Sequence, residues 1–206
     1  MLIGLNGFAR AGKDTVGDYL VENYGFEKRS FAAPLKESAS RLLMVPVALL
    51  DKFKDDEDAF VQVVLPQGTV ELSFRQFLQR YGTESHRDVF GQDFWVNVAF
   101  APMDGEGFGG KEYYIKNNVC FTDARFENEL VGVMTRGGAN IRINRETEGV
   151  GNHPSEVAPR EGLIDFVIDN NGTFDELYSQ VDEAMDWFGV TRQVREETLE
   201  GHLLLP

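Results

Sequence analysis

The chain contains very little cysteine. One cysteine, Cys120, occurs among 206 residues, so no disulfide can form within the chain. No cluster of Cys and His has the spacing of a structural zinc site. This composition is typical of proteins in a reducing compartment, and we therefore expect a cytoplasmic protein.

Positive charge is also scarce. The chain has 20 Lys and Arg against 34 Asp and Glu, which gives a formal net charge of −14. Binding to a nucleic-acid backbone depends on many cationic side chains that neutralise phosphates, so we expect no nucleic-acid partner. A small anionic substrate is still compatible with this charge, because a few local cations suffice to hold it.

Long apolar runs are absent as well. No stretch approaches the roughly 18 to 20 apolar residues that a membrane-spanning helix needs. The first residues, MLIGLNG, lack the basic segment followed by an apolar segment that is typical of a secretory signal. We therefore expect no membrane partner.

The pattern that is present is an alternation of short apolar runs with segments of helical periodicity. Hydrophobic residues make up 42% of the chain and charged residues 26%, as in ordinary globular domains. Strands that alternate with helices predict a single α/β domain around a mostly parallel sheet. The predicted strands are LIGLN, the segment that begins FEKRSF, VCFTD, ANIRIN and DFVIDN.

Helix signals lie between these strands. Two glycines are positioned to end helices, and several Ser, Thr, Asp and Pro residues are positioned to start them. The final helix should carry an apolar stripe formed by Phe174, Leu177, Val181, Met185 and Phe188. We expect helices from Lys13 to Gly25, from near Pro34, from Ser73 to Gly82, after Asp93 and after Thr173.

Three segments are harder to interpret. Residues 44–72 combine the charge run DKFKDDEDAF, which predicts a solvated loop, with the segment VVLPQGTVEL, which predicts a hairpin, so we expect an insertion or flap. Residues 145–162 contain glycines and the motif NHPSE, which suggest a lid. Residues 189–206 form a tail of mixed charge that ends in LLLP and has no assigned role.

The most informative motif is GFARAGKDT, residues 7–15, directly after the first predicted strand. Its G-x-x-x-x-G-K spacing is that of a phosphate-binding loop. Gly7 and Gly12 permit backbone torsions that let consecutive N–H groups curl around a phosphate, and the following helix directs its positive N-terminal end to the same place. Lys13 would reach the terminal phosphates, so we predict a nucleotide site.

One position of this loop departs from the usual motif. Asp14 stands where a Ser or Thr normally offers its hydroxyl to Mg²⁺. A carboxylate can also bind the metal, although it brings negative charge near phosphates. Thr15 is the alternative source of the hydroxyl, and the sequence leaves both possibilities open.

A second candidate group follows the strand VCFTD. Asp123 ends that strand, where it could hold Mg²⁺ directly or through water, and Arg125 could neutralise a transferring phosphate. A strand-ending Asp is also often a helix cap. Because ligands bind beyond the carboxyl ends of parallel strands, we expect Gly7, Asp123 and Asn144 to meet at one edge of the sheet.

Further cations and aromatics could complete the site. Arg binds phosphate through two parallel hydrogen bonds, and Trp can stack on a base. Taken singly, each such residue is more often a surface charge or a core aromatic. We assign no catalytic role to His153 in NHPSE, because phosphoryl transfer depends mainly on positioning and electrostatics. The candidates are Lys36, Arg75, Arg80, Thr83 and Trp95.

Together these motifs resemble the deoxynucleoside monophosphate kinases of bacteriophages. The resemblance covers most of the chain to about residue 188 and spares residues 44–72 and the tail. In that family G-K-D-T is the usual form of the loop, so the resemblance implies that an Asp at position 14 is normal for the family. The motifs that carry the resemblance are GFARAGKDT, FAAPLK, QRYGTE, TDARFENE, HPSE and DFVIDNNGTFDELYSQV.

The resemblance implies a fold, a reaction and a set of site residues. The fold would be the three-layer sandwich of P-loop, nucleoside monophosphate kinase-like proteins. The reaction would move the γ-phosphate of ATP to a deoxynucleoside 5′-monophosphate (dNMP) with Mg²⁺, in the host cytoplasm if a phage encodes the chain. ATP would be held by Arg10, Gly12, Lys13, Asp14 and Thr15, and the dNMP by Leu35, Lys36, Arg75, Gly82, Thr83, Trp95, Asp123 and Arg125.

Within this set the resemblance implies distinct roles. Lys13, Asp123 and Arg125 would be catalytic, and Asp14, Thr15 and Asp123 would bind the metal. Some relatives have a Lys where this chain has Ala9, so Arg75 or Arg125 would compensate in binding the acceptor phosphate. Relatives form dimers, and FWVNVAF could serve either such an interface or the core.

Two alternatives remain open at this point. The chain could be another small-molecule kinase on the same scaffold, such as a dephospho-coenzyme A kinase or a phosphomevalonate kinase. It could also be a nucleotide-binding regulator without turnover. The base of the acceptor, and discrimination between ribose and deoxyribose, are not readable from the sequence.

Overall fold

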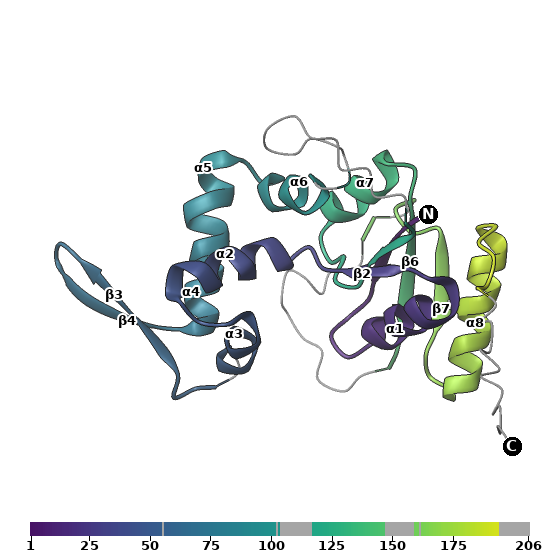
Figure 1. Cartoon of the computed structure of the whole chain (residues 1–206), viewed down its shortest axis with the longest axis horizontal. Coiled ribbons are helices and arrows are strands. Elements are labelled where there is room, and N and C mark those ends of the chain that lie inside the picture. The colour runs from purple at the N-terminus through teal and green to yellow at the C-terminus, as the bar shows by residue number, and fades with distance from the viewer. Residues whose placement is uncertain (55, 102, 104–116, 147–158, 161, 194–206) are drawn as a thin grey trace, which may run out of the picture.

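A five-stranded, fully parallel sheet organises the chain (Figure 1). The computed structural model describes residues 1–54, 56–101, 103, 117–146, 159–160 and 162–193. All five residues of the central strand β1 are buried, as expected of a parallel strand covered on both faces. The strand order is β2 (Glu27–Arg29), β5 (Val119–Phe121), β1 (Leu2–Asn6), β6 (Ala139–Asn144) and β7 (Phe166–Asp169).

Helices cover both faces of this sheet, which gives the predicted three-layer α/β architecture. The helices α1 (Lys13–Tyr24) and α8 (Phe174–Trp187) pack on one face, against Ile3 and Leu5 of β1. On the other face, α6 (Phe94–Phe100) and α7 (Glu127–Thr135) pack against Leu2 of the same strand. Successive strand residues therefore supply two separate cores, because their side chains alternate between faces.

The ends of two helices match the sequence signals. Gly25 adopts φ 67° after α1 and forms its left-handed cap. Thr173 forms a capping box with Glu176 at the start of α8. The predicted stripe of α8 is confirmed for Leu177, Val181 and Met185, whereas Phe174 is 66% exposed and lies outside the core.

A second region is built mainly from helices and projects from the sheet (Figure 1). This helical region comprises residues 33–93, and we call the remainder of the described chain the sheet region. A small core of Ala39, Leu50, Phe74 and Leu78 holds it together. Its elements are α2 (Ala33–Leu43), α3 (Val47–Phe53), the hairpin β3 (Phe60–Leu65) and β4 (Gly68–Ser73), α4 (Phe74–Gly82), the π-helical turn η1 (Thr83–Arg87) and α5 (Asp88–Phe90).

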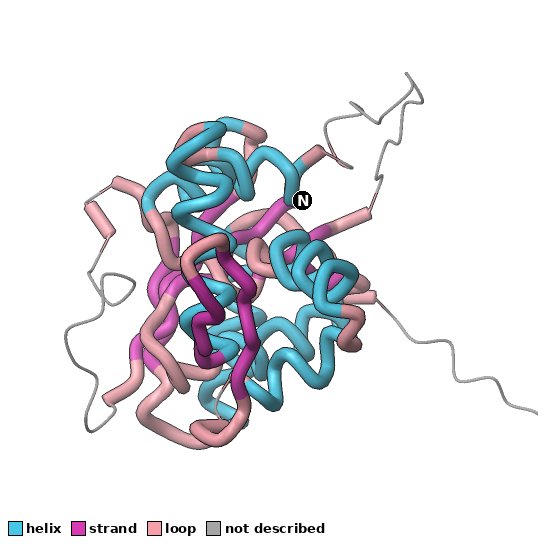
Figure 2. The backbone as a smooth tube through the Cα atoms, turned by 90° about the vertical axis from the view of Figure 1, so that its left-hand side faces the viewer, coloured by secondary structure: helices cyan, strands magenta, loops and turns pink. Residues whose placement is uncertain are grey.

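The hairpin in this region confirms one expectation, and α3 corrects another. Strands β3 and β4 pair antiparallel along their whole length, and the hairpin lies nearest the viewer in Figure 2. The expectation of a solvated loop at the charge run is wrong for residues 51–53, which lie in α3. Leu50 of α3 is fully buried, while Asp51 and Lys52 are exposed, so the charges occupy the outer face of an amphipathic helix.

Gly82 is the last residue of α4, as predicted, but it does not form a left-handed helix cap. Its backbone is right-handed, with φ −72° and ψ −40°, and the helical path continues through η1 to Phe90. A Cβ at this position would lie 3.2 Å from Leu35 and 3.8 Å from Trp95. This glycine therefore permits close packing and is not a stop signal.

Two other expectations are met only in part. Asp93 lies at the N-cap of α6, but its side chain forms no cap bond and accepts a hydrogen bond from Asn128 at 2.9 Å. The core interpretation of FWVNVAF is correct for Trp95, Val96 and Phe100, which are buried. The interface interpretation of the same segment remains a prediction.

No helix in the described part of the chain is long and apolar enough to cross a membrane. Most of the predicted lid and of the tail lies outside the described residues.

Candidate active site

A cleft of about 1800 Å³ lies beyond the carboxyl ends of β1, β2 and β5, between the sheet region and the helical region. Its walls come from the phosphate loop, the β2–α2 segment, α4, η1, α6 and the loop after β5. The structure brings together in this one cleft all of the predicted ligand-binding residues: Arg10, Gly12, Lys13, Asp14, Thr15, Leu35, Lys36, Arg75, Gly82, Thr83, Trp95, Asp123 and Arg125.

The phosphate loop needs glycine at both ends for steric reasons. Gly7 and Gly12 adopt φ 148° and 105°. A Cβ at Gly7 would lie 2.5 Å from the carbonyl of Ile143, and one at Gly12 would collide with the side-chain amide of Asn170. No side chain caps the start of α1, so its first N–H groups are available to an anion.

Lys13 is folded back into this loop. Its ammonium donates hydrogen bonds to the carbonyls of Gly7 and Phe8, at 2.8 and 2.7 Å. Burial, with help from the positive charge of Arg125, lowers the pKa of Lys13 to about 8, while Asp14 and Asp123 act in the opposite direction. The side chain is therefore still mainly protonated at neutral pH and is held beside the position that a phosphate would take.

Asn170 supports the phosphate loop, a role that was not predicted from the sequence. Its side-chain amide donates to the carbonyl of Ala11 at 2.8 Å, and its backbone N–H donates to the carbonyl of Asn144 at 2.7 Å. The available signal was that an Asn directly follows the last strand of a parallel sheet, at the edge where the loop lies.

The carboxylate of Asp123 accepts three hydrogen bonds from the segment that leads into α2. The donors are the Ser30 hydroxyl at 2.6 Å, the Phe31 N–H at 2.7 Å and the Ala32 N–H at 3.1 Å. Asp123 thereby links the end of β5 to the start of the acceptor-side helix. The motif alone does not show this positioning function.

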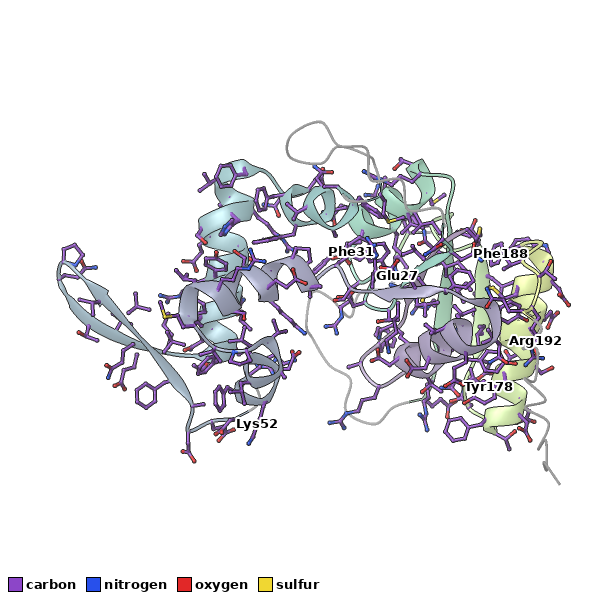
Figure 3. The ribbon with its side chains drawn as sticks, viewed as in Figure 1. Glu27, Phe31, Lys52, Tyr178, Phe188 and Arg192 are labelled. Atoms are coloured by element: carbon purple, nitrogen blue, oxygen red, sulfur yellow. The ribbon has the colours of Figure 1, made fainter. Side chains whose placement is uncertain are left out.

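Phe31 anchors the same segment in the core. Its ring is stacked on Phe121 at 4.2 Å between centroids and meets the edge of Phe100 at 5.3 Å. Phe31 lies where the helical region joins the sheet region (Figure 3). The hydrogen bonds of Asp123 and this aromatic contact therefore set the position of α2 relative to the phosphate loop.

Glu129 is the second functional candidate that the sequence analysis missed. One of its carboxylate oxygens accepts hydrogen bonds from the Arg125 N–H at 2.7 Å and the Phe126 N–H at 3.0 Å. Burial raises the pKa of Glu129 to about 7, although these two hydrogen bonds oppose the rise. The available signal was an acidic residue in the first turn of the helix that follows D-A-R-F.

The acceptor side of the cleft has an aromatic wall. Trp95 is buried and donates from its indole nitrogen to the carbonyl of Gly82 at 3.0 Å, which fixes the orientation of the ring. Leu35 also packs against Gly82, and a Cβ at that position would lie 3.2 Å from its side chain. Lys36 forms an ion pair with Asp51 at 2.6 Å, so a helical-region contact orients this cation.

Two residues that the sequence analysis considered do not join the cleft. Asn144 ends β6 at the predicted sheet edge, but its side chain accepts a hydrogen bond from Arg142 at 2.9 Å. Arg80 points outward and lies 3.8 Å from Glu84 in an exposed ion pair. The motif residues His153, Ser155 and Glu156 lie outside the described residues.

Protein ligands for a metal are few. Among the residues that the structure describes, no group of three His, Cys, Asp or Glu side chains could hold an ion. The Asp14 side chain is 80% exposed, with a carboxylate oxygen 3.5 Å from the Lys28 ammonium, and Thr15 lines the cleft next to it. This arrangement fits Mg²⁺, which usually keeps several waters and binds one or two protein oxygens plus substrate phosphates.

Comparison with known proteins identifies relatives along almost the whole chain, although no family model matches it. A mimivirus protein provisionally named a deoxynucleotide monophosphate kinase is 29% identical over 202 residues, which span 90% of this chain and 96% of its own. The deoxynucleotide monophosphate kinase of Escherichia phage RB69 is 23% identical over 255 residues, spanning 89% and 99%. These relatives confirm the resemblance drawn from the motifs.

Among solved structures, shikimate kinase from Bacteroides thetaiotaomicron aligns with a TM-score of 0.40 and 11% identity, over 92% of this chain and 98% of its own. The strand order observed in the chain, and not this likeness, supports the fold assignment.

Proposed function

The chain is a homologue of viral and phage deoxynucleotide monophosphate kinases along about nine-tenths of its length, and we propose that it catalyses ATP + dNMP → ADP + dNDP. The observation that carries the proposal is the composition of the cleft. Residues of a phosphate-binding loop and residues of a separate acceptor wall line the same 1800 Å³ space. A bound ATP and a bound monophosphate could therefore meet within it.

On the donor side, backbone N–H groups and cations would hold the triphosphate. The start of α1 presents uncapped N–H groups beside Lys13, and Arg10 lines the same part of the cleft. A phosphate would replace the loop carbonyls as the partner of the Lys13 ammonium. Because an anion favours the charged ammonium, it would also raise the lowered pKa of Lys13.

The residues that would hold Mg²⁺ are Asp14 and Thr15, with Asp123, which lines the same cleft. When bound, the ion supplies positive charge that offsets charge developing on the β- and γ-phosphates. Asp14 could contribute its oxygen through a bound water, because its exposed side chain lies close to the Lys28 cation.

On the acceptor side, the chain would act mainly by positioning. Asp123 and Phe31 hold the start of α2, which carries Leu35 and Lys36 into the cleft. Arg125, whose backbone Glu129 fixes, would neutralise charge on the transferring group. No strong base is needed, because the attacking phosphate oxygen is already anionic.

The first test is an assay of ADP release with ATP and Mg²⁺. The acceptors are dTMP, dGMP, dCMP, dAMP and their ribose counterparts, with a control that lacks any acceptor. We expect turnover with some of the deoxynucleotides and a low rate without acceptor. This result would also identify the preferred base.

Other outcomes separate the alternatives. Turnover only with an acceptor that is not a nucleoside monophosphate, such as dephospho-coenzyme A or phosphomevalonate, would replace the proposal with a different small-molecule kinase. ATP binding without ADP formation under any acceptor would indicate a regulator and would overturn the proposed reaction.

A further inference from the structure

Arg87 is a cleft residue that neither the phosphate loop nor the acceptor motifs include. It is the last residue of η1, the π-helical turn between α4 and α5, and it lines the cleft together with Thr83 of the same turn. Short π-helical turns often occur at functional sites, because the wider turn redirects side chains. The η1 turn continues the helix beyond Gly82 and carries both side chains to the cleft.

The guanidinium of Arg87 has one buried donor without a hydrogen-bonding partner in the part of the chain that the structure describes. Its Nε is buried and makes no hydrogen bond, and no carboxylate there forms an ion pair with the group. The contact that it does make is with an aromatic ring, because its Cζ lies 5.3 Å from the ring centroid of Phe126.

This arrangement is unusual for a guanidinium. Arg remains charged at any pH at which the protein is folded, so it cannot avoid the cost of burial by losing its proton. A cation–π contact offsets part of that cost, but the ring provides no hydrogen-bond acceptor for the N–H groups of the guanidinium. A buried donor without a partner is unfavourable, and a bound ligand with acceptor atoms would remove the deficit.

The position of Arg87 indicates which part of a nucleotide it would meet. The charge of Arg125 contributes to the lowered pKa of Lys13, so Arg125 is a cation near the phosphate loop. Arg87 instead contributes to the pKa of Glu129, at the start of α7. Arg87 and the ring of Phe126 lie on the acceptor side of the cleft, where Trp95 also contributes to the lining.

We propose that Arg87 binds the base of the acceptor nucleotide by donating hydrogen bonds to acceptor atoms on the base edge. The proposal rests on the proposed kinase function and adds a specificity-determining residue to it. Ring carbonyls and unprotonated ring nitrogens accept from a guanidinium, whereas exocyclic amino groups do not. Because bases differ in where they carry these groups, Arg87 would stabilise them unequally.

The test uses Arg87→Met, which keeps an aliphatic chain over Phe126 and removes every donor, and Arg87→Lys, which keeps the charge without the planar fork. The matched control is Arg80→Met, because Arg80 is an exposed helical arginine outside the cleft. KM and kcat are measured for each dNMP and for ATP. We expect KM for the preferred dNMP to rise roughly 10- to 100-fold in Arg87→Met, with smaller rises for the other bases.

The same experiment contains the results that would overturn the assignment. A KM change equal for all bases would place Arg87 on the phosphate or sugar, and unchanged KM values would remove it from the acceptor site. KM for ATP should stay within about twofold of wild type and the thermal midpoint should be preserved, because the buried Nε of Arg87 makes no hydrogen bond that the variant would lose.

Direct binding keeps this inference separate from the proposed reaction. Calorimetric titration with each dNMP is carried out on wild type and on Arg87→Met in the absence of ATP. If wild type binds a dNMP but never releases ADP, the kinase proposal fails, and a base-dependent loss of binding in the variant still supports Arg87. If binding is identical in the two proteins, the assignment of Arg87 fails even when turnover is observed.

Discussion

The sheet region and the helical region differ in how much core they have. The sheet region has two clusters, one on each face, and its strand residues Ile3, Leu5 and Ile141 are completely buried. The helical region has one small cluster, in which Phe74 and Leu78 remain 7% and 8% exposed. The projecting hairpin β3–β4 has little cover, with Val64 81% exposed.

This difference matches the two proposed tasks. A phosphate loop works by holding N–H groups in fixed positions, and it is built directly on the central strand and on α1, both in the larger core. The acceptor wall is carried by helices with less buried apolar surface, and such elements open at lower free energy than the main core. We therefore expect the two sides of the cleft to respond differently to mutation.

The largest effect is expected on the donor side. Lys13→Ala should lower kcat by a factor on the order of 100 or more, because it removes a cation that would stabilise the transferring phosphate. The fold should persist, since the hydrogen bonds of the Lys13 ammonium go to carbonyls of its own loop. Steady-state kinetics and circular dichroism check this, with Lys52→Ala on the exposed face of α3 as control. A variant with near-normal kcat would contradict the proposed reaction.

A pair of core substitutions tests the difference in stability directly. Leu20→Ala in α1 and Leu50→Ala in α3 each empty a fully buried site, for which a cost of about 2 to 5 kcal/mol is usual. Hydrogen exchange should show faster exchange throughout the molecule for Leu20→Ala. For Leu50→Ala it should show faster exchange mainly in residues 33–93.

Leu20→Ala and Leu50→Ala should also differ in their steady-state kinetics. We expect Leu50→Ala to raise KM for the dNMP while leaving the affinity for ATP near that of wild type. Equal loss of protection in both regions after Leu50→Ala would show that the chain unfolds as one unit, and the distinction between the regions would then be dropped.

The raised pKa of Glu129 predicts that the stability of the folded chain depends on pH. Its folded-state pKa of about 7 lies above the ordinary value of 4.5, so the folded chain binds more protons than the unfolded chain between these values. The free energy of unfolding should therefore fall as pH rises through this window, by about 1 to 3 kcal/mol from this group. Glu129→Gln keeps an oxygen for the two N–H donors and should remove that slope.

Urea unfolding at pH 5 and pH 7.5 measures the effect. The control is Glu127→Gln in the same helix, because Glu127 is exposed and its pKa is lowered by Arg160, below this window. An unchanged slope in Glu129→Gln would mean that Glu129 is ionised in the folded chain at both pH values.

The smallest expected effect concerns the support of the phosphate loop. Asn170→Asp replaces a donor to the Ala11 carbonyl with a carboxylate that repels it, and we expect KM for ATP to rise roughly tenfold. KM for the dNMP should change little. Asn171→Asp places the same charge one residue away, where the side chain forms hydrogen bonds with Glu146 and Asp169, so an equal effect there would indicate charge alone.

Local features were predictable from the sequence because local chemistry decides them. The phosphate loop follows from glycine spacing, the cap of α8 from Thr173, and the buried β1 from a run of apolar residues. The helix α3 was missed because three of its seven residues belong to a segment dominated by charge. The role of Gly82 was predicted only in part, because glycine serves both helix ends and close packing, and only the neighbours Leu35 and Trp95 show the second use.

The sequence by itself determined the parallel α/β architecture and most of the residues that line the cleft, since periodicity, turn chemistry and motif spacing are properties of neighbouring residues. Only the tertiary structure decided how those residues are supported. Asn170 contacts a loop residue 159 positions away, and Asp123 contacts Phe31 at a separation of 92. Such contacts depend on the order in which strands join the sheet, which no local pattern in the sequence encodes.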